Sequence, residues 1–155
     1  MSLASVRAFF AERAPDIEII VLADSTATVA LAAEAHGVEP ARIAKTLTLK
    51  VGERIVLLVA RGDARLDNRK AKDTFGAKVR MLEAEVVADV TGHPIGGVCP
   101  FGLATPLPVY CDVSLKVFEE VLPAAGAINA AIRIAPERLV DLVGAQWVDV
   151  CQTAG

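Results

Sequence analysis

Two neighbouring strand patterns in the middle of the chain restrict its fold more than any other feature. Residues 44–51 and 54–60 are rich in aliphatic and β-branched side chains, and only Gly52 and Glu53 separate them. A two-residue connection that begins with glycine is typical of a tight hairpin between antiparallel strands. The chain is therefore not expected to fold around a purely parallel sheet.

Further helix and strand patterns lie on both sides of this hairpin. Apolar spacing, capping residues and glycine stops predict six helices: one over residues 3–15, a second that begins after one of residues 24–28 and ends at residue 36, and four over residues 67–75, 83–90, 114–122 and 136–143. The second helix has four candidate N-caps, namely Asp24, Ser25, Thr26 and Thr28. Shorter apolar runs predict strands over residues 17–22, 79–81, 109–113, 130–134 and 147–151.

The composition is that of one packed domain. The chain has 155 residues, of which 54% are hydrophobic, and it shows no repeat or linker, so residues 1–155 are expected to form a single mixed α/β domain. Its longest apolar runs, such as 55–60, are much shorter than the ~20 residues of a membrane span. The first residues lack the pattern of a signal peptide, so we expect a cytoplasmic location without membrane association.

Cysteine usage points to reduced thiols. The three cysteines, Cys99, Cys111 and Cys151, are an odd number and show no CxxC spacing. Neither a disulfide framework nor a zinc site is indicated. We expect no metal and no cofactor.

Charge is distributed unevenly along the chain. The formal net charge is −3, which argues against a protein that binds nucleic acid over its whole surface. Residues 41–80, however, contain 11 basic and 4 acidic residues, a balance of +7, and the remaining 115 contain 5 basic and 15 acidic residues, a balance of −10. We call residues 41–80 the cationic segment. It contains the basic helix with Arg69, Lys70 and Lys72, which is either a track for phosphates or an ordinary solvated face.

Lys45 is the first candidate functional residue. Alternation along a strand places it on the same face as Leu47, Leu49 and Val51. Lysine is rarely buried without a partner, so its ammonium group is expected either to reach water at the strand edge or to contact an anion or a carbonyl group at a pocket mouth.

A glycine- and proline-rich loop is the second candidate. Residues 91–108 contain four Gly and four Pro, a density incompatible with a regular helix or central strand. Its core, residues 96–102 (GGVCPFG), would let backbone amides approach a ligand oxygen, as in an oxyanion hole; the alternative is a rigid surface connection. Neither a Walker loop nor a dinucleotide fingerprint is present.

Three side chains have both a structural and a functional interpretation. Cys99 and His93 could form a cysteine hydrolase pair, or could be a small buried residue beside a loop histidine. Asp112 interrupts an apolar run and could cap the next helix, contact a substrate amine or brace Lys45. His36, just before Gly37, is expected to interact with the last carbonyls of its helix.

Several of these segments together resemble a known family. The chain is similar, from about residue 24 to 150, to the YbaK/EbsC-type aminoacyl-tRNA deacylases, which are related to the editing (INS) domain of bacterial prolyl-tRNA synthetases. The resemblance is carried, in this order, by Gly37-Val38, Ile43-Ala44-Lys45-Thr46-Leu47, Gly96-Gly97-Val98-Cys99-Pro100-Phe101-Gly102, Val109-Tyr110-Cys111-Asp112 and Ile134-Ala135-Pro136 through Leu139.

The resemblance implies a compact, mostly antiparallel β-barrel-like sheet flanked by helices, and hydrolysis of the ester between a wrongly attached amino acid and the 3′-terminal adenosine of a tRNA. It implies a catalytic region of Lys45, Gly96, Gly97 and Val98, in which the lysine contacts a terminal phosphate or carbonyl group and the loop amides hold the ester. The attacking group in this family is a substrate hydroxyl, a bound water or the thiol of a cysteinyl substrate. Substrate contacts are implied for Thr46, Cys99, Pro100, Phe101, Gly102 and Asp112.

The resemblance also suggests partners and a substrate range. The aminoacylated acceptor end of tRNA is the expected partner, held in part by Arg69, Lys70 and Lys72; an aminoacyl-tRNA synthetase is a second candidate partner, DNA is not expected, and the protein is expected to be a monomer or weak dimer. Thr46 matches the Cys-directed branch, whereas the alanine-directed branch commonly has Asn there. Because residues 100–103 differ from both branches, the expectation stops at a small amino acid such as Ala, Cys, Ser or Thr.

Three functional classes are compatible with these features. The leading hypothesis is a free-standing deacylase of mischarged tRNA. The second is a non-catalytic module of the same fold that binds tRNA ends or a synthetase. The third is a hydrolase that uses Cys99 as its nucleophile. Turnover separates the first two, and substitution of Cys99 tests the third.

Overall fold

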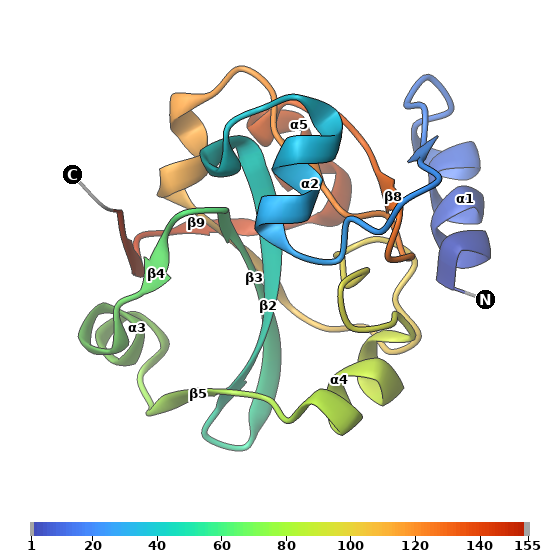
Figure 1. Cartoon of the computed structure of the whole chain (residues 1–155). Coiled ribbons are helices and arrows are strands. Elements are labelled where there is room, and N and C mark those ends of the chain that lie inside the picture. The colour runs from blue at the N-terminus through green and yellow to red at the C-terminus, as the bar shows by residue number, and fades with distance from the viewer. Residues whose placement is uncertain (1, 154–155) are drawn as a thin grey trace.

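The computed structural model describes residues 2–153 and shows a mixed α/β fold (Figure 1). Five α-helices and ten strands are arranged around one central sheet within these residues. The helices are α1 (Ser2–Arg13), α2 (Val29–His36), α3 (Asn68–Phe75), α4 (Ala84–Thr91) and α5 (Pro136–Val143), and two 3-10 helices are η1 (Pro40–Arg42) and η2 (Val113–Val117). The strands are β1 (Ile20–Val21), β2 (Ile43–Val51), β3 (Arg54–Arg61), β4 (Arg65–Leu66), β5 (Val79–Met81), β6 (Val109–Asp112), β7 (Leu122–Pro123), β8 (Ala130–Ala131), β9 (Gln146–Val148) and β10 (Cys151–Gln152).

The predicted hairpin of β2 and β3 is confirmed and forms the centre of the sheet. The two strands pair antiparallel from Ala44 with Arg61 to Val51 with Arg54, across the turn at Gly52, whose φ is +59°. Strand β2 also pairs antiparallel with β5 and parallel with β7, and β3 continues the sheet through parallel pairs to β6 and β9. Separate antiparallel pairs join β1 to β8 and β4 to β10. The sheet is therefore mixed, and the hairpin supplies its central antiparallel pair.

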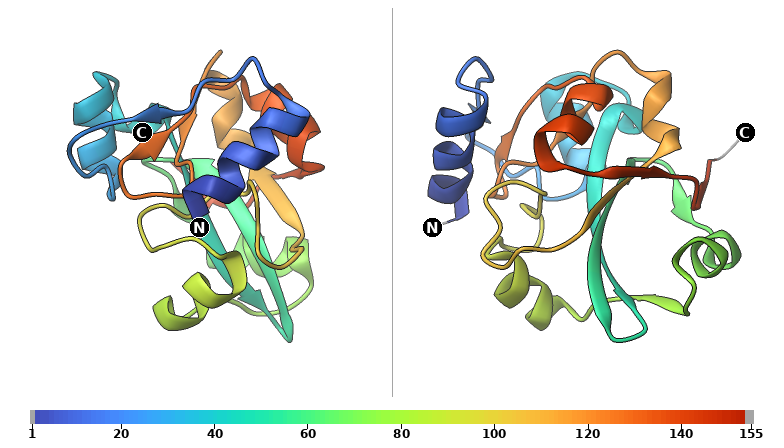
Figure 2. Two further views of the ribbon diagram at one scale, coloured as in Figure 1. Left: turned by 90° about the vertical axis from the view of Figure 1, so that its right-hand side faces the viewer. Right: turned by 180° about the vertical axis from the view of Figure 1, so that it is seen from behind.

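Two hydrophobic clusters lie on the two faces of this sheet. The first contains Leu57 and Val59 of β3 together with residues of α1, α5 and the glycine-rich loop. The second contains Val56 and Leu58 of β3 with Leu49 and Val51 of β2, covered by Ala71 of α3 and by the C-terminal segment. Helices α1 and α3 accordingly lie on opposite sides of the molecule in Figure 1, and the rear view of Figure 2 shows α5 in front of the strands. Both faces of the hairpin are therefore buried along much of its length.

Helix α1 fixes the position of the glycine-rich loop. Val6 and Phe10 are its buried residues, and the Phe10 ring packs on Phe101 of the loop with 4.7 Å between ring centroids. The Ser5 hydroxyl donates a hydrogen bond of 3.0 Å to the carbonyl oxygen of Gly102. As predicted, the loop has no helix or strand between Gly92 and Pro108. Its shape therefore depends on these tertiary contacts.

The predicted helix over residues 114–122 is wrong. Only the short η2 forms there, and the chain then extends into β7, which pairs with Ile43 and Ala44 of β2. The Asp112 carboxylate accepts a hydrogen bond from the Ser114 amide and closes a tight turn, whereas Phe118 already has the extended φ and ψ of −112° and 147°. Leu115 and Leu122 are both buried, but they belong to different elements, η2 and β7, and not to one face of a helix.

Three predicted strands are shorter or divided. The strand expected over residues 17–22 is reduced to β1, and that over 130–134 to β8. The strand expected over 147–151 is divided into β9 and β10, because the Val150 amide donates to the Asp112 carboxylate instead of to a strand. Among the candidate caps of α2, Thr28 is the N-cap, and its hydroxyl accepts a hydrogen bond of 3.1 Å from the Leu31 amide.

Candidate functional site

A cavity of about 290 Å³ lies beside the N-terminal half of β2. Its walls come from β2, from helices α2 and α4, which lie near the top and at the lower right of Figure 1, from the glycine-rich loop and from the β7–β8 region. Most lining side chains are alanine or branched aliphatic residues, and the polar ones are Thr26, Thr28, His36, Lys45, Thr46 and Thr48. Ligand sites of proteins are commonly apolar cavities with a few polar groups, and this volume suits a small ligand group.

Alternation along β2 divides its residues between the cavity and the second core cluster. Ala44, Thr46 and Thr48 line the cavity, and Leu47, Leu49 and Val51 belong to the second cluster on the other face. The sequence predicted this division from the two-residue period of a strand. Two residues with hydroxyl groups, Thr46 and Thr48, therefore lie on the cavity side of β2.

Lys45 is at the border between these two environments. It is partly buried and is among the residues that line the cavity, but its Nζ donates a hydrogen bond to the carbonyl oxygen of Ala64, a residue of the second cluster. Burial lowers the pKa of Lys45, and the nearby Asp63 carboxylate opposes that shift. Asp63 is itself held by Arg61, whose guanidinium donates to its two carboxylate oxygens at 2.5 and 2.8 Å. The ammonium group is thus held at the turn between β3 and β4.

The glycine-rich loop contributes to the cavity through Gly96 and Val98. Gly96 has φ of +90°, and a Cβ atom there would lie 2.7 Å from the Cβ of Ala27 across the wall. Gly97 points the other way, because a Cβ there would meet the backbone of Ala127, and its amide donates to the Pro94 carbonyl oxygen at 2.9 Å. Of the three consecutive residues predicted to form the oxyanion site, the middle one therefore has its amide occupied by a turn.

The other loop candidates lie behind the cavity wall. Cys99, Pro100 and Phe101 are buried, and the side chains of Cys99 and Phe101 belong to the first core cluster. Gly102, with φ of +58°, packs against the backbone of Ser5. Sequence order placed these residues with Gly96, but the structure separates the cavity-lining part of the loop from the part that packs on α1.

Cys99 and His93 are close together, and their chemistry is not that of a nucleophile and base. Cys99 Sγ is 3.6 Å from His93 Nε2, which in turn is 2.7 Å from the carbonyl oxygen of Phe101. A carbonyl oxygen only accepts, so His93 Nε2 carries the proton and cannot take one from the thiol. Burial raises the pKa of Cys99 to about 12, and burial also lowers the pKa of His93. Both groups are therefore neutral at pH 7.

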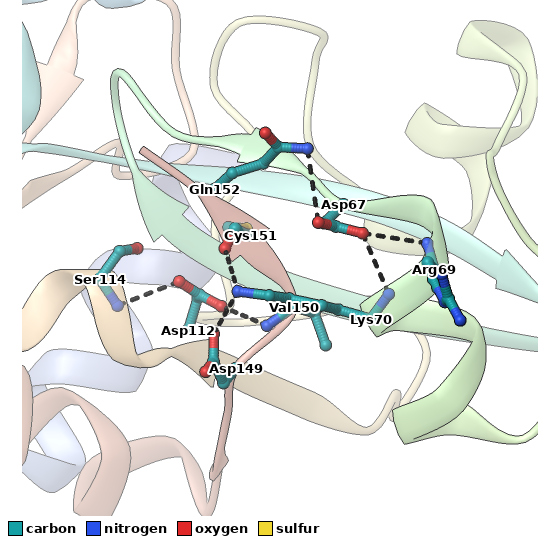
Figure 3. A network of polar contacts seen from close by, with 9 residues as sticks. All are labelled: Asp67, Arg69, Lys70, Asp112, Ser114, Asp149, Val150, Cys151 and Gln152. Atoms are coloured by element: carbon teal, nitrogen blue, oxygen red, sulfur yellow. Dashed lines mark hydrogen bonds and ion pairs between the residues drawn. The ribbon is translucent and has the colours of Figure 1, made fainter. Parts of the chain in front are cut away.

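Asp112 connects two segments of the backbone. Its side chain is buried, and its two oxygens accept hydrogen bonds from the amides of Ser114 and Val150 at 3.0 and 2.8 Å (Figure 3). It lies outside the cavity lining. Of the roles expected for it, the structure shows the capping one.

One of the three basic side chains of helix α3, Lys70, contacts other parts of the protein. Lys70 Nζ contacts Asp149 and the carbonyl oxygen of Cys151, each at 3.2 Å, while Asp67 caps the helix and accepts a longer bond from Gln152 (Figure 3). Arg69 and Lys72 are exposed, and neither forms an ion pair within residues 2–153. Lys70 thus fastens the C-terminal segment, and Arg69 and Lys72 project into solvent.

Sequence reasoning missed two residues of the cavity that have chemical potential. Alternation along the strand places Thr48 on the same face as Thr46, but no functional role was expected for it; in the structure it lines the cavity. His36 also lines it, and its Nε2 has no hydrogen-bond partner within residues 2–153, so this atom does not bond the last carbonyls of its helix as expected. Burial and the charge of Arg133 both lower the pKa of His36. Within residues 2–153, Thr46 Oγ1, Thr48 Oγ1 and His36 Nε2 are buried atoms without a hydrogen-bond partner.

Two general properties of the chain bear on the class of site. Within the part of the chain that the structure describes, no three His, Cys, Asp or Glu side chains gather as a metal site would require. Over the same residues, no helix is long and apolar enough to cross a membrane.

The described residues thus form a mixed α/β domain with a small cavity between its sheet and its glycine-rich loop. The chain belongs to the aminoacyl-tRNA editing domain family, whose model matches residues 23–142. This finding confirms the resemblance inferred from the order of the lysine strand, the loop and the Tyr110 strand.

Curated relatives cover the chain to different extents. YwhH, an uncharacterised protein of Bacillus subtilis, is 47% identical over 98% of both chains. EbsC of Enterococcus faecalis, provisionally named a Cys-tRNA(Pro)/Cys-tRNA(Cys) deacylase, is 32% identical over 76% of this chain and 73% of its own. A proline–tRNA ligase of Citrifermentans bemidjiense is 37% identical over 63% of this chain but only 17% of the ligase.

The fold is also shared with solved structures. A protein described provisionally as a trans-editing enzyme for prolyl tRNA synthetase superposes with a TM-score of 0.90 at 36% identity, covering 97% of each chain. The similarity to this structure extends over nearly the whole chain and confirms the expected fold class.

Proposed function

We propose that this protein hydrolyses the ester bond of mischarged aminoacyl-tRNA as a free-standing editing enzyme, with a small amino acid as the released group. The observation that carries the proposal is the cavity between β2 and residues 96–98 in a member of the editing-domain family. Its volume of about 290 Å³ suits a small aminoacyl group better than a whole nucleotide. The provisional names of EbsC and of the trans-editing structure support the same chemistry.

The net reaction consumes one water molecule. The oxygen of water adds to the ester carbonyl carbon, the bond from that carbon to the ribose oxygen breaks, and the ribose oxygen takes up a proton from the water to become a hydroxyl group as the amino acid leaves. Negative charge collects on the carbonyl oxygen in the intermediate, and preorganised backbone amides stabilise such an oxyanion. In the proposal, the loop at Gly96 and Val98 supplies this environment and Thr46 contacts the bound aminoacyl group.

Lys45 has a proposed role at the border of the cavity. Lys45 lines the cavity together with Thr46, and its ammonium group is held by the Ala64 carbonyl. From there it would contact the terminal phosphate or the ester carbonyl of the tRNA. Arg69 and Lys72 of the cationic segment would attract the acceptor stem through its phosphates.

Substitution of Lys45 tests the proposal directly. Lys45→Ala should reduce release of amino acid from small aminoacyl-tRNAs by at least about a hundredfold while leaving the circular dichroism spectrum unchanged, if the ammonium group stabilises charge in the transition state. Lys50→Ala is the matched control, because it removes the same charge from the same strand. If the wild type hydrolyses none of the Ala, Cys, Ser and Thr esters of tRNA, the editing function is refuted and the non-catalytic binding module is favoured.

A further inference from the structure

Two neighbouring hydroxyl groups on the cavity face of β2 lack hydrogen-bond partners in the described part of the chain. Thr48 is only 3% exposed, and its Oγ1 is buried without a hydrogen-bond partner within residues 2–153; Thr46 Oγ1 is in the same condition. Buried polar atoms in native structures nearly always find a partner, so an unpartnered pair beside a cavity needs an explanation. A ligand that hydrogen-bonds to them supplies one.

The spacing of the two threonines suits an aminoacyl group lying along the strand. Residues i and i+2 of a strand are about 6–7 Å apart on one face. Thr46 follows Lys45, so in the proposed editing function it lies nearer the ester. Thr48 is farther along β2, where its carbonyl accepts a hydrogen bond from the Leu82 amide at 2.9 Å. The aminoacyl side chain would therefore extend toward Thr48.

The surroundings of Thr48 make its hydroxyl distinctive. Met81, Leu82 and Val87 line the adjoining wall with aliphatic atoms. Rotation about the Cα–Cβ bond moves Oγ1 among three staggered positions, so a change of rotamer can direct the Thr48 hydroxyl toward a ligand. A site that can hydrogen-bond a substrate group discriminates against an analogue that lacks it far more strongly than an aliphatic pocket does.

We propose that Thr48 makes this cavity select aminoacyl groups whose side chains carry a hydroxyl or thiol over the alanyl group. This inference rests on the proposed editing function, and it assigns to Thr48 a role in specificity and none in the chemical step.

The test compares substrates on one tRNA. Thr48→Val keeps the shape of the side chain and removes the hydroxyl. The ratio of kcat/KM for seryl-tRNA to that for alanyl-tRNA should fall about tenfold in the variant, the size expected for one lost hydrogen bond. Because the hydroxyl has no partner among residues 2–153, the thermal midpoint should stay the same or rise, which separates loss of specificity from loss of folding.

Thr26→Val is the matched control. Thr26 lines the same cavity, but its hydroxyl already donates to the Ile128 carbonyl oxygen at 3.1 Å. This variant should lose stability and keep the seryl-to-alanyl ratio, even where both rates fall. If the seryl-to-alanyl ratio of kcat/KM stays unchanged in Thr48→Val, including the case in which kcat/KM falls equally for both substrates, the proposed role of Thr48 is overturned.

A binding measurement keeps this inference distinct from the proposed reaction. Calorimetry with non-hydrolysable 3′-amide analogues of seryl- and alanyl-adenosine should show tighter binding of the seryl compound, and Thr48→Val should abolish that preference. A wild-type preference without turnover would refute the deacylase and support the selectivity. Turnover by a wild type that shows no preference in either assay would support the deacylase and refute the selectivity.

Discussion

At the scale of single residues, burial separates chemistry from structure in the glycine-rich loop. Cys99 is fully buried, its pKa is raised to about 12, and the neighbouring His93 holds its proton toward the Phe101 carbonyl. A thiol that remains protonated at pH 7 is a poor nucleophile, since the thiolate is the reactive form. Cys99 is therefore best described as a packing residue of the first core cluster.

Cys99→Ala should accordingly keep its deacylase rate within about twofold of the wild type. The smaller side chain leaves a void in the core, so we expect a loss of about 1 kcal/mol in the free energy of unfolding. Rate measurements on an aminoacyl-tRNA that the wild type hydrolyses, together with urea denaturation, check both parts. Complete inactivation of a stably folded Cys99→Ala protein would contradict this expectation and support the hypothesis that Cys99 is the nucleophile of a hydrolase.

Strand alternation explains which single residues could be predicted. The faces of Thr46 and Leu47 follow directly from a period of two, since a strand places neighbours on opposite sides. Asp112 could not be assigned in this way, because its partner Val150 is 38 residues away and the contact depends on how β6 and the C-terminal segment pack. The role of Cys99 could not be predicted from the sequence for the same reason, because its burial depends on how the loop packs against α1.

At the scale of elements, the glycine-rich loop forms a cavity wall that leaves no room for side chains at Gly96. Its φ of +90° is strained for any other residue, and an added Cβ would lie 2.7 Å from Ala27. Gly96→Ala should therefore lower the free energy of unfolding by about 1–2 kcal/mol and displace the loop from β2. Deacylation should fall more than tenfold.

The matched control for this substitution is Gly144→Ala at the end of α5. Gly144 also has a positive φ, of +67°, but a Cβ there would have no heavy atom of the described residues within 4 Å. It should lose comparable stability from backbone strain and retain turnover. Thermal melts and deacylation assays on both variants distinguish the contact with Ala27 from backbone strain, and equal turnover in the two would contradict the role assigned to Gly96.

Element boundaries show where sequence patterns fail. The hairpin turn at Gly52 and the stops of α2 and α3 at Gly37 and Gly76 were predictable, because each needs a positive φ that glycine adopts readily. The segment 114–122 had helical spacing, but Pro123 lies immediately after it and β2 offered an unpaired edge, so a strand formed at Leu122 instead. Pairing with a distant strand carries no local signal.

At the scale of the whole molecule, the uneven charge should govern how tRNA binds. Arg69 and Lys72 project from α3, whereas Lys70 is held by Asp149. Replacing both Arg69 and Lys72 with Gln should weaken tRNA binding and reduce the slope of log affinity against log salt by up to about 2, one for each lost phosphate contact. Filter binding over a series of salt concentrations measures both effects.

The matched control removes two cations from outside the cationic segment. Arg7 of α1 and Lys116 of η2 are exposed, so the double Gln variant has the same net charge as the α3 variant. It should leave the salt slope unchanged. If both double variants weaken binding equally, net charge governs the association and the cationic segment has no special role.

Strand β2 has consequences for how selectivity could diverge among relatives. Its odd-numbered residues from Leu47 to Val51 are fixed by the second core cluster, while its even-numbered residues Thr46 and Thr48 face the cavity. Because the two sets are on opposite faces, a change of amino-acid preference can arise by substitution on one face without repacking the other. A lineage could therefore acquire a new substrate through one or two mutations in β2 at little cost in folding stability.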